Sequence, residues 1–410
     1  MSSSSAKSLP TFREPFTIDV VNRFLDKIPF SAPFLLLLPA LTYLYDQHSR
    51  NLPLTLVPAS DQLLPRLRSL LFTEYRWVGY AWVFTLVKTV NRTLNRYVRN
   101  HGQYRRDPIR YDRDVIVITG GSAGIGKEIV QLLSHRKGAT VAVLDMGAPT
   151  YLAAPKGKPE ILYFKTDVSN PDQVAEAARQ IRQRTGKKVG ALINCAGIAS
   201  GNTILDVDLA SAARVWRVNT LSNWVTCQQF LPDLIAANHG HVVTVSSSGA
   251  YASLPSMSEY ATSKAAALAF HEVLSIELRT RYSAPRVRTT LVAPTKVRTA
   301  LGDGMEDHTD PFFTPVLEPV QVARQIVGAL DSGLSQHIMT PHFANLLPWL
   351  RALPDWYRRF LAIVGDTDNT VTQKSMSRAL SNGYGANWEG EDKALYEKRR
   401  LAHQQQATKK

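Results

Sequence analysis

The sequence predicts an α/β fold: a doubly wound parallel sheet of about seven strands, preceded by a hydrophobic helical anchor and followed by a helical extension. Two observations predict the sheet. Between Asp114 and about Pro341, short apolar strands alternate with helical stretches, and these strands are almost entirely β-branched or aliphatic, as strands covered on both faces are. Apolar segments before and after this region predict the N-terminal anchor and the C-terminal extension. The expected parts are residues 1–113, 114–341, 342–384 and 385–410.

The composition allows a large folded core. Hydrophobic residues make up 44% of the chain and charged residues 20%, which argues against global disorder. The net charge of +14 suits a phosphate-bearing ligand, an anionic membrane or nucleic acid. Only Cys195 and Cys227 are present, so we expect no disulfide framework and a reducing compartment.

The N-terminal region contains two apolar segments, Ile28–Tyr45 and Trp77–Val87. The first has no charge, but a helix of that length spans roughly 27 Å, just short of a bilayer core. We expect Pro29, Pro33 and Pro39 to kink it. These features favour membrane attachment through a bent hairpin or an interfacial anchor, and the alternative is a hairpin packed on the protein's own core. The first residues are not typical of a cleaved signal peptide.

A basic run follows the second apolar segment. It resembles the patch that flanks membrane anchors on the cytoplasmic side. The arginines lie in no zinc, helix-turn-helix or RNA-binding motif, so we expect no nucleic-acid partner. The run consists of Lys88, Arg92, Arg96, Arg99, Arg105, Arg106, Arg110 and Arg113.

Seven segments of the central region are expected to be strands, the last of them with the weakest pattern. They are Val115–Thr119, Thr140–Leu144, Ile161–Lys165, Ala191–Asn194, His241–Ser246, Arg288–Ala293 and Gln336–Met339.

A glycine-rich turn joins the first strand to a helix. Glycine permits positive φ and lets the backbone approach a pyrophosphate, which binds at the positive end of the helix dipole. The turn contains Gly120, Gly121, Gly124 and Gly126, and we expect Gly138 to end the helix. Its position between a strand and a helix favours a dinucleotide site over a simple tight turn.

Asp145 ends the second strand, where a carboxylate can accept both hydroxyls of an adenosine ribose. The same charge would repel a 2′-phosphate. Its neighbours Leu144 and Met146 provide no cation, and neither does the glycine turn. The sequence therefore favours NAD over NADP, with NADP as the alternative.

Tyr260 and Lys264 are spaced i, i+4 in a predicted helix, so their side chains share one face. A lysine cation beside a phenol is expected to lower the pKa of Tyr260 and make it a general acid or base. Ser247 lies at the end of the preceding strand, where ligands bind in parallel sheets. Its hydroxyl can hold a substrate oxygen.

These motifs together resemble the short-chain dehydrogenase/reductase family over residues 114–340. Six motifs occur in the family's order. They are Thr119–Gly126 for TGxxxGIG, Asp167 and Val168 for the adenine-side aspartate, Asn194–Gly197 for NNAG, Asn219 for the helix asparagine, then Ser247, Tyr260 and Lys264, and Pro294–Thr299 for PGxxxT.

The resemblance implies a Rossmann-type sheet, a nicotinamide cofactor and no metal. It implies a proton exchange between Tyr260 and the substrate oxygen, which Ser247 orients. Lys264 would lower the pKa of Tyr260 and hold the nicotinamide ribose, and Asn219 would place a water in a proton relay. The cofactor residues it implies are Gly120, Ser122, Gly124, Ile125, Gly126, Asp145, Asp167, Val168, Asn194, Ala196, Gly197, Tyr260, Lys264, Pro294, Val297 and Thr299.

The sequence departs from the family pattern at three places. Cys195 replaces the second asparagine of NNAG, and we expect a packed, unreactive thiol. Thr295 replaces the glycine after Pro294. The segment between Asp145 and Asp167 is rich in proline and glycine, so the helix usual there is expected to be short or missing.

The flanks resemble those of the microsomal and lipid-droplet members, including retinol dehydrogenases and the 17β-hydroxysteroid dehydrogenases of the 16C group. This implies a lipophilic alcohol or carbonyl substrate, a membrane or lipid-droplet surface, and a cytoplasmic catalytic domain at the endoplasmic reticulum or a droplet. A homodimer through the helices carrying Asn219 and Tyr260 is also implied. The alternative function is a membrane or droplet scaffold that senses NAD with little turnover.

Two further segments are expected to cover the substrate. The loop from Lys296 to Pro319 carries Leu301, Met305, Phe312, Phe313 and Leu317, and we expect an apolar lid there. Residues 345–365 are apolar and aromatic with interspersed arginines. They predict a membrane-surface helix pair, a lid over an apolar pocket or a helix that completes the core. Residues 385–410 form a polar tail.

Overall fold

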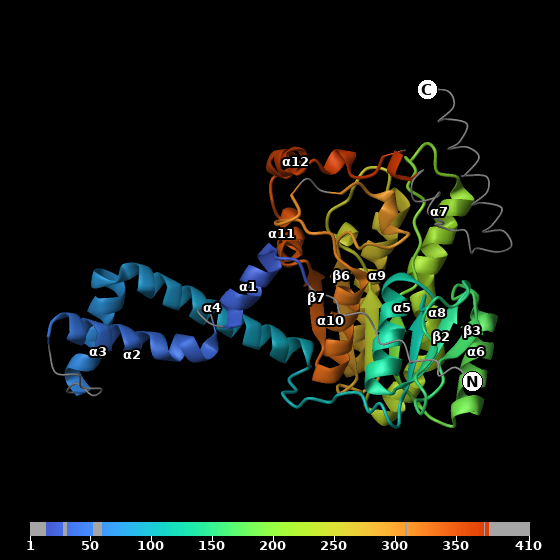
Figure 1. The fold of residues 1–410 in the computed structure, drawn as a ribbon, viewed down its shortest axis with the longest axis horizontal. Helices are drawn as coiled ribbons and strands as arrows, with labels where there is room; N and C mark the ends of the chain where they lie inside the picture. The colour runs from blue at the N-terminus through green and yellow to red at the C-terminus, as the bar shows by residue number, and fades with distance from the viewer. Residues whose placement is uncertain (1–13, 28–30, 52–59, 308–309, 373, 377–410) are drawn as a thin grey trace, which may run out of the picture. The chain divides into compact units, whose positions relative to one another are not determined.

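The computed structural model describes residues 14–27, 31–51, 60–307, 310–372 and 374–376 (Figure 1). Two compact units contain them: Phe16–Arg99, and a second unit that begins at Asn100 and includes Glu14 and Pro15. The expected polar tail, and residues 28–30 of the first apolar segment, lie outside the described residues.

The second unit is built on one sheet of seven parallel strands in the order β3-β2-β1-β4-β5-β6-β7. All seven strands predicted from the sequence are confirmed, with ends shifted by no more than about two residues. The strands are β1 (Val115–Thr119), β2 (Thr140–Asp145), β3 (Leu162–Lys165), β4 (Val189–Asn194), β5 (His241–Val245), β6 (Arg288–Pro294) and β7 (Gln336–Thr340).

Helices cover both faces of the sheet, and every central strand is buried on both sides. One core joins the sheet to α5 (Gly124–Gln131), η2 (Leu132–Lys137) and α10 (Pro319–Ser332). A second core on the opposite face joins it to α6 (Pro171–Thr185), α8 (Ser222–Ala237) and α9 (Ser258–Thr280). Gly138 ends η2 with φ of +65°, as expected.

The remaining elements of this unit lie in the connections and in the C-terminal extension. They are α7 (Leu209–Trp216), η3 (Arg217–Leu221), η4 (Ser248–Ala250), η5 (Gly302–Gly304), η6 (His342–Leu346), α11 (Leu347–Leu350), α12 (Asp355–Val364) and η7 (Thr367–Asn369).

The direction of strand order reverses between β1 and β4. The connections leaving these two strands therefore run to opposite sides, which opens a crevice at the carboxyl ends of the strands. The connection after β2 contains no helix, as the sequence predicts, and it turns back over the crevice. Thr150 donates from its amide (3.1 Å) and its hydroxyl (2.6 Å) to the carbonyl oxygen of Ser122 in the glycine turn.

The segment that begins at Asn100 belongs to the unit built on the sheet, whereas the sequence placed the boundary after residue 113. Asn100 pairs with Ser335, whose amide donates to Asn100 Oδ1 at 2.8 Å. The guanidinium of Arg288, buried at the start of β6, donates to the carbonyl oxygen of Arg105 at 2.9 Å. Part of the basic run is therefore fastened to the sheet by buried polar contacts.

His239 joins this same segment to the domain. Its Nδ1 lies 3.0 Å from Asp107 Oδ1 and its Nε2 lies 3.4 Å from Asp114 Oδ2. Arg286 also pairs with Asp107, at 2.8 Å. The hydrogen bond to Asp114 and the charge of Asp107 raise the pKa of His239 although burial opposes them.

The unit Phe16–Arg99 is helical. It comprises α1 (Ile18–Lys27), α2 (Ala32–Ser49), α3 (Ser60–Ser69), η1 (Leu70–Glu74) and α4 (Arg76–Arg99). The helix α2 continues through Pro39, and α4 carries the second apolar segment and the first half of the basic run on one helix. Among the described residues, no helix combines the length and the apolarity needed to cross a bilayer.

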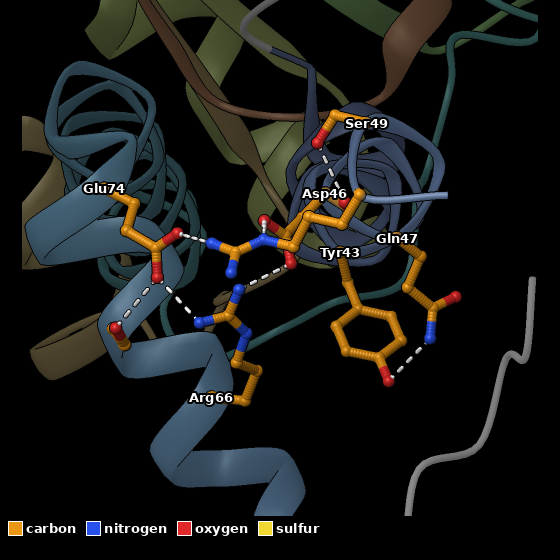
Figure 2. Close-up of polar contacts among 8 residues, drawn as sticks. Tyr43, Asp46, Gln47, Ser49, Arg66 and Glu74 are labelled. Atoms are coloured by element: carbon orange, nitrogen blue, oxygen red, sulfur yellow. Dashed lines mark hydrogen bonds and ion pairs between the residues drawn. The ribbon is translucent and has the colours of Figure 1, made fainter. Parts of the chain in front are cut away.

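An ion network around one buried carboxylate connects helices of this unit (Figure 2). Asp46 is buried and accepts hydrogen bonds from Arg50 at 2.8 Å and from Arg66 at 2.6 Å. Both arginines also pair with Glu74 of η1. Two cations shared by two carboxylates link α2 to the α3–η1 segment, and both arginines compensate the buried charge of Asp46.

The His239 contact predicts a dependence of stability on pH. Because the folded state raises the pKa of His239, its contribution is fully present below about pH 6.5 and is lost as the pH rises through the folded pKa. We expect the Tm of the wild type to fall between about pH 6 and pH 8 more than that of His239→Gln, measured by circular dichroism. Parallel Tm profiles for the two proteins would contradict this assignment.

Candidate active site

A cavity of about 580 Å³ opens at the carboxyl ends of the strands. Its size is that of a typical ligand site. Sixteen of the residues predicted from the sequence line it. They are Gly120, Ser122, Gly124, Ile125, Gly126, Asp145, Asp167, Val168, Ala196, Gly197, Ser247, Tyr260, Lys264, Pro294, Val297 and Thr299. Two others, Asn194 and Asn219, lie buried outside the lining.

Within the glycine turn, backbone atoms pack directly against other backbone atoms. A Cβ on Gly126 would lie 2.0 Å from the carbonyl oxygen of Gly120, so no side chain fits there. Gly124 has φ of +55°, a conformation that residues with a side chain rarely adopt. The N-cap of α5 is Ala123, which has no group to cap the first turn. The exposed positive end of this helix fits the pyrophosphate of a dinucleotide.

The loop after β4 is held in place by two side chains. Thr119 Oγ1 accepts hydrogen bonds from the amides of Cys195 (3.0 Å) and Ala196 (3.1 Å). The carboxamide of Asn219 pairs with both backbone groups of Ile198, at 2.8 and 2.9 Å. Its Nδ2 also donates to Ser263 Oγ on α9 at 3.0 Å. The side chain of Asn219 is thus occupied in positioning the loop and the catalytic helix.

Asp145 faces the cavity and organises the loops around it. Its Oδ2 accepts from the amide of Ser122 at 2.8 Å, and its Oδ1 accepts from the amide of Gly147 at 2.9 Å. Each carboxylate oxygen retains lone-pair capacity for a ribose hydroxyl. None of the residues in these contacts is a cation.

Asp167 is paired with an arginine that the sequence did not single out. Arg214 of α7 donates to Asp167 Oδ2 at 2.9 Å and to Ser169 Oγ at 2.6 Å, and it lines the cavity. Burial raises the pKa of the Asp167 carboxyl, but hydrogen bonds from Ser169 and the charge of Arg214 outweigh it and lower the pKa. No sequence spacing indicates this pair, because its members come from different helices and loops.

Tyr260 and Lys264 lie one turn apart on α9, as predicted, and Ser247 lies just after β5. Ser247 Oγ accepts from the amide of Gly249 at 3.1 Å, and both this oxygen and the Tyr260 ring lie against Gly249. Lys264 Nζ lies 5.8 Å from the centre of the Tyr260 ring and donates to the carbonyl oxygen of Val245 at 3.0 Å. The three side chains therefore meet at one point of the cavity wall.

The expected direction of the Tyr260 pKa is wrong for this structure. Burial raises the pKa of Tyr260, and the hydrogen bond from Ser247 only partly offsets it. Burial also lowers the pKa of Lys264 to about 8, so near that pH the lysine is only partly charged. The i, i+4 spacing predicted a lowered pKa for Tyr260 because spacing does not show that Tyr260 and Lys264 are both removed from water.

Burial also raises the pKa of Cys195 to about 12. The thiol is then protonated near neutral pH, in keeping with the packed, unreactive cysteine that the sequence predicted.

The end of the cavity beyond Tyr260 is apolar. Its lining includes Leu254, Met257, Leu301, Met305, Phe343 and Leu347. Only part of the predicted lid takes part: Phe312 and Phe313 pack on each other outside the lining, and Leu317 is buried in the core. Phe343 and Leu347 line this end of the cavity instead, because the chain after β7 runs back across it.

The C-terminal extension completes this wall. Gly365, Thr367 and Thr370 line the cavity, and Met376 packs with Met257 in a small buried cluster beside Tyr260. The sequence proposed a lid, a surface helix pair or a core helix for this region, and the structure shows that the extension covers the apolar end.

Comparisons with known proteins agree with this site. Residues 114–310 match the family model described as short chain dehydrogenase. The chain is 40% identical over 200 residues to Dehydrogenase RED2 of Cochliobolus heterostrophus, covering 49% of this chain and 72% of that protein. It is 32% identical over 252 residues to Short-chain dehydrogenase/reductase 3 of Homo sapiens (58% and 76%). Identity to Epidermal retinol dehydrogenase 2 of Mus musculus is 29% over 245 residues (58% and 78%).

The match of the family model, the relatives that share most of their length with this chain and the parallel sheet agree. The chain belongs to the short-chain dehydrogenase family, and it is an oxidoreductase that acts on a small-molecule alcohol or carbonyl group with a nicotinamide cofactor.

Proposed function

We propose that the protein is an NAD-dependent dehydrogenase that interconverts a lipophilic alcohol and its ketone or aldehyde. One observation carries the proposal. Tyr260, Ser247 and Lys264 meet where the dinucleotide end of the cavity joins an end lined by apolar side chains. A retinoid, a steroid or a long-chain lipid alcohol fits such an end, and the relative named as a retinol dehydrogenase supports this class.

The side chains divide the proton chemistry between them. A bound nicotinamide cofactor would supply the hydride chemistry. In the oxidation direction, Tyr260 Oη takes the proton of the substrate hydroxyl while the carbon atom that bears this hydroxyl gives up a hydride, for which the oxidised nicotinamide would be the acceptor. Ser247 holds the substrate oxygen by a hydrogen bond, and Lys264 provides a nearby cation that favours the phenolate. In the reduction direction, Tyr260 returns its proton to the carbonyl oxygen.

The raised pKa of Tyr260 favours the protonated phenol at neutral pH. A protonated phenol is ready to donate to a carbonyl oxygen, whereas alcohol oxidation needs the phenolate. Oxidation is therefore expected to accelerate as the pH rises, and reduction to be favoured at lower pH.

The first experiment measures NAD reduction by the full-length protein in detergent on retinol, steroid alcohols and long-chain alcohols. Tyr260→Phe removes the hydroxyl that exchanges the proton, so we expect kcat to fall by about 100-fold or more with little change in NADH affinity. Tyr282→Phe is the matched control, because this exposed tyrosine at the end of α9 lies outside the cavity lining.

Retained turnover in Tyr260→Phe would contradict the catalytic assignment. The absence of turnover on every alcohol, despite measurable NADH binding, would instead favour a scaffold that senses the cofactor.

The preference for NAD rests on Asp145. Its carboxylate faces the cavity, and its two contacts are backbone amides rather than cations. A 2′-phosphate placed beside it would meet an uncompensated negative charge.

Asp145→Asn tests this preference by removing the charge while keeping an oxygen that accepts one of the two amides. We expect the Kd of NADP to fall relative to that of NAD by about tenfold, measured by fluorescence titration. An unchanged ratio of the two Kd values would assign the preference to other residues.

Association with a membrane or a lipid droplet is supported by the unit Phe16–Arg99. One stripe of α4 exposes apolar side chains, and its C-terminal half carries exposed arginines. The stripe consists of Trp77, Tyr80, Phe84, Val87, Leu94 and Val98, and α2 exposes Leu37, Leu41 and Tyr45. Aromatic and basic residues in this arrangement suit a membrane interface. We place the protein at the endoplasmic reticulum or a lipid droplet, with its free thiols on the reducing, cytoplasmic side.

A homodimer through the helices that carry Asn219 and Tyr260 is supported by apolar side chains exposed on α7, η3, α8 and α9. They are Trp216, Leu221, Trp224, Val273 and Ile276. We expect Ile276→Arg to convert a dimer into a monomer in light scattering of the detergent-solubilised protein, because it places a charge in an apolar interface. Ile204→Arg, at an exposed isoleucine outside these helices, is the control. A dimer that survives Ile276→Arg would contradict this interface.

A further inference from the structure

The C-terminal extension is held to the catalytic unit on both sides of α12. Before α12, Arg351 donates to the carbonyl oxygens of Ala250 (2.9 Å) and Tyr251 (3.2 Å), which closely follow Ser247. After α12, the hydroxyl of buried Ser375 donates to the carbonyl oxygen of Gly304 at 2.8 Å. The helix is therefore fixed at both ends across one end of the domain (Figure 1).

The helix α12 nevertheless buries none of its residues. Trp356 is 73% exposed, Phe360 53%, Ile363 61% and Val364 68%, and their spacing of i, i+4, i+7 and i+8 places them on one face. In the turn before it, Trp349 is 71% exposed. A firmly attached helix that presents such a face is a docking surface rather than a loose end.

The chain segments on either side of this apolar face line the active-site cavity. Phe343 and Leu347 precede α12 and line the cavity, and Gly365 and Thr367 follow it and line the cavity as well. A partner that covers α12 therefore lies beside the apolar end of the cavity. A lipophilic alcohol dissolved in that partner would reach the cavity without crossing water.

The side chains on the helix favour a lipid surface as the partner. Tryptophan, tyrosine and arginine are the residues enriched where a protein meets lipid headgroups. Arg358 pairs with Asp355 and Arg359 with Asp368, but all four groups are exposed, so these ion pairs are weak and can be exchanged for lipid phosphates.

We infer that α12, with Trp349 before it, inserts its apolar face into the lipid surface and holds the mouth of the cavity there, so that the substrate enters from the lipid. The inference rests on the proposed function for the identity of the substrate. The insertion itself does not depend on turnover.

The insertion is tested with the full-length protein carrying Phe360→Cys labelled with the environment-sensitive dye NBD. Cys227 is buried and Cys195 is partly buried, whereas the side chain at position 360 is exposed, so the new thiol is labelled preferentially, and the protein without Phe360→Cys gives the background. We expect a blue shift of the emission on vesicles of phosphatidylcholine with phosphatidylserine, and quenching by brominated acyl chains. Gln183→Cys, at an exposed position near the end of α6, is the control and should show neither effect.

A kinetic test uses Trp356→Ser combined with Phe360→Ser. Because α12 buries no residue, these changes are not expected to unfold the domain. The KM for retinol presented in vesicles should rise by about tenfold. The kcat/KM for a short, water-soluble alcohol should remain unchanged, which separates docking from a structural effect on catalysis.

The outcomes distinguish the two proposals. A label at position 360 that stays in water while the protein binds vesicles through another region would overturn the inference, as would equal kinetic losses on both substrates. A label that enters the lipid, in a protein that oxidises no lipophilic alcohol, would support the docking surface and reject the proposed substrate class.

Discussion

The rest of the site depends on the close approach of two backbones, the glycine turn after β1 and the loop after β4. A Cβ on Gly120 would lie 2.7 Å from the Cα of Ala196, and one on Gly126 would lie 2.0 Å from the oxygen of Gly120. Protein interiors are close-packed, so the neighbouring atoms cannot move away to make room for a Cβ at either position. Because the glycine turn contacts the backbone of the loop after β4, the N-terminal end of α5 faces the cavity. For the same reason, Thr119 accepts hydrogen bonds from two amides of that loop.

Buried hydrogen bonds connect the dinucleotide end of the cavity to α9, the helix that carries Tyr260 and Lys264. Asn219 bridges Ile198 and Ser263, and Glu259, buried beside Tyr260, accepts from the amide of Ser200 at 2.9 Å. Ser246 donates to the backbone of Lys264 at 2.8 Å. Each such bond contributes about 1 kcal/mol, but leaving one buried partner unpaired costs about 1–3 kcal/mol. The network therefore resists rearrangement, and the phenol of Tyr260 is held beside Ser247.

Both units expose apolar surface that a dehydrogenase working in water alone would not need. The helices α2 and α4 of one unit and α12 of the other all expose apolar or aromatic stripes. Monomeric proteins seldom leave such patches uncovered. The extension lines the apolar end of the cavity with the residues before and after α12, and α12 itself exposes an apolar face. The same segment therefore contributes both to the substrate end of the site and to the surface from which we propose the substrate comes.

Local sequence patterns were sufficient for the strands, the glycine turn and the helix carrying Tyr260 and Lys264, because alternation, glycine content and i, i+4 spacing act over a few residues. Sequence could not indicate that Arg214 pairs with Asp167, that Phe343 and Leu347 line the cavity instead of Phe312 and Phe313, or that residues 100–113 belong to the unit built on the sheet. These contacts link residues far apart in the chain. The pKa of Tyr260 shows the same division: its neighbours in sequence favour the phenolate, but burial, which only the tertiary structure determines, raises the pKa because the charged form loses its water.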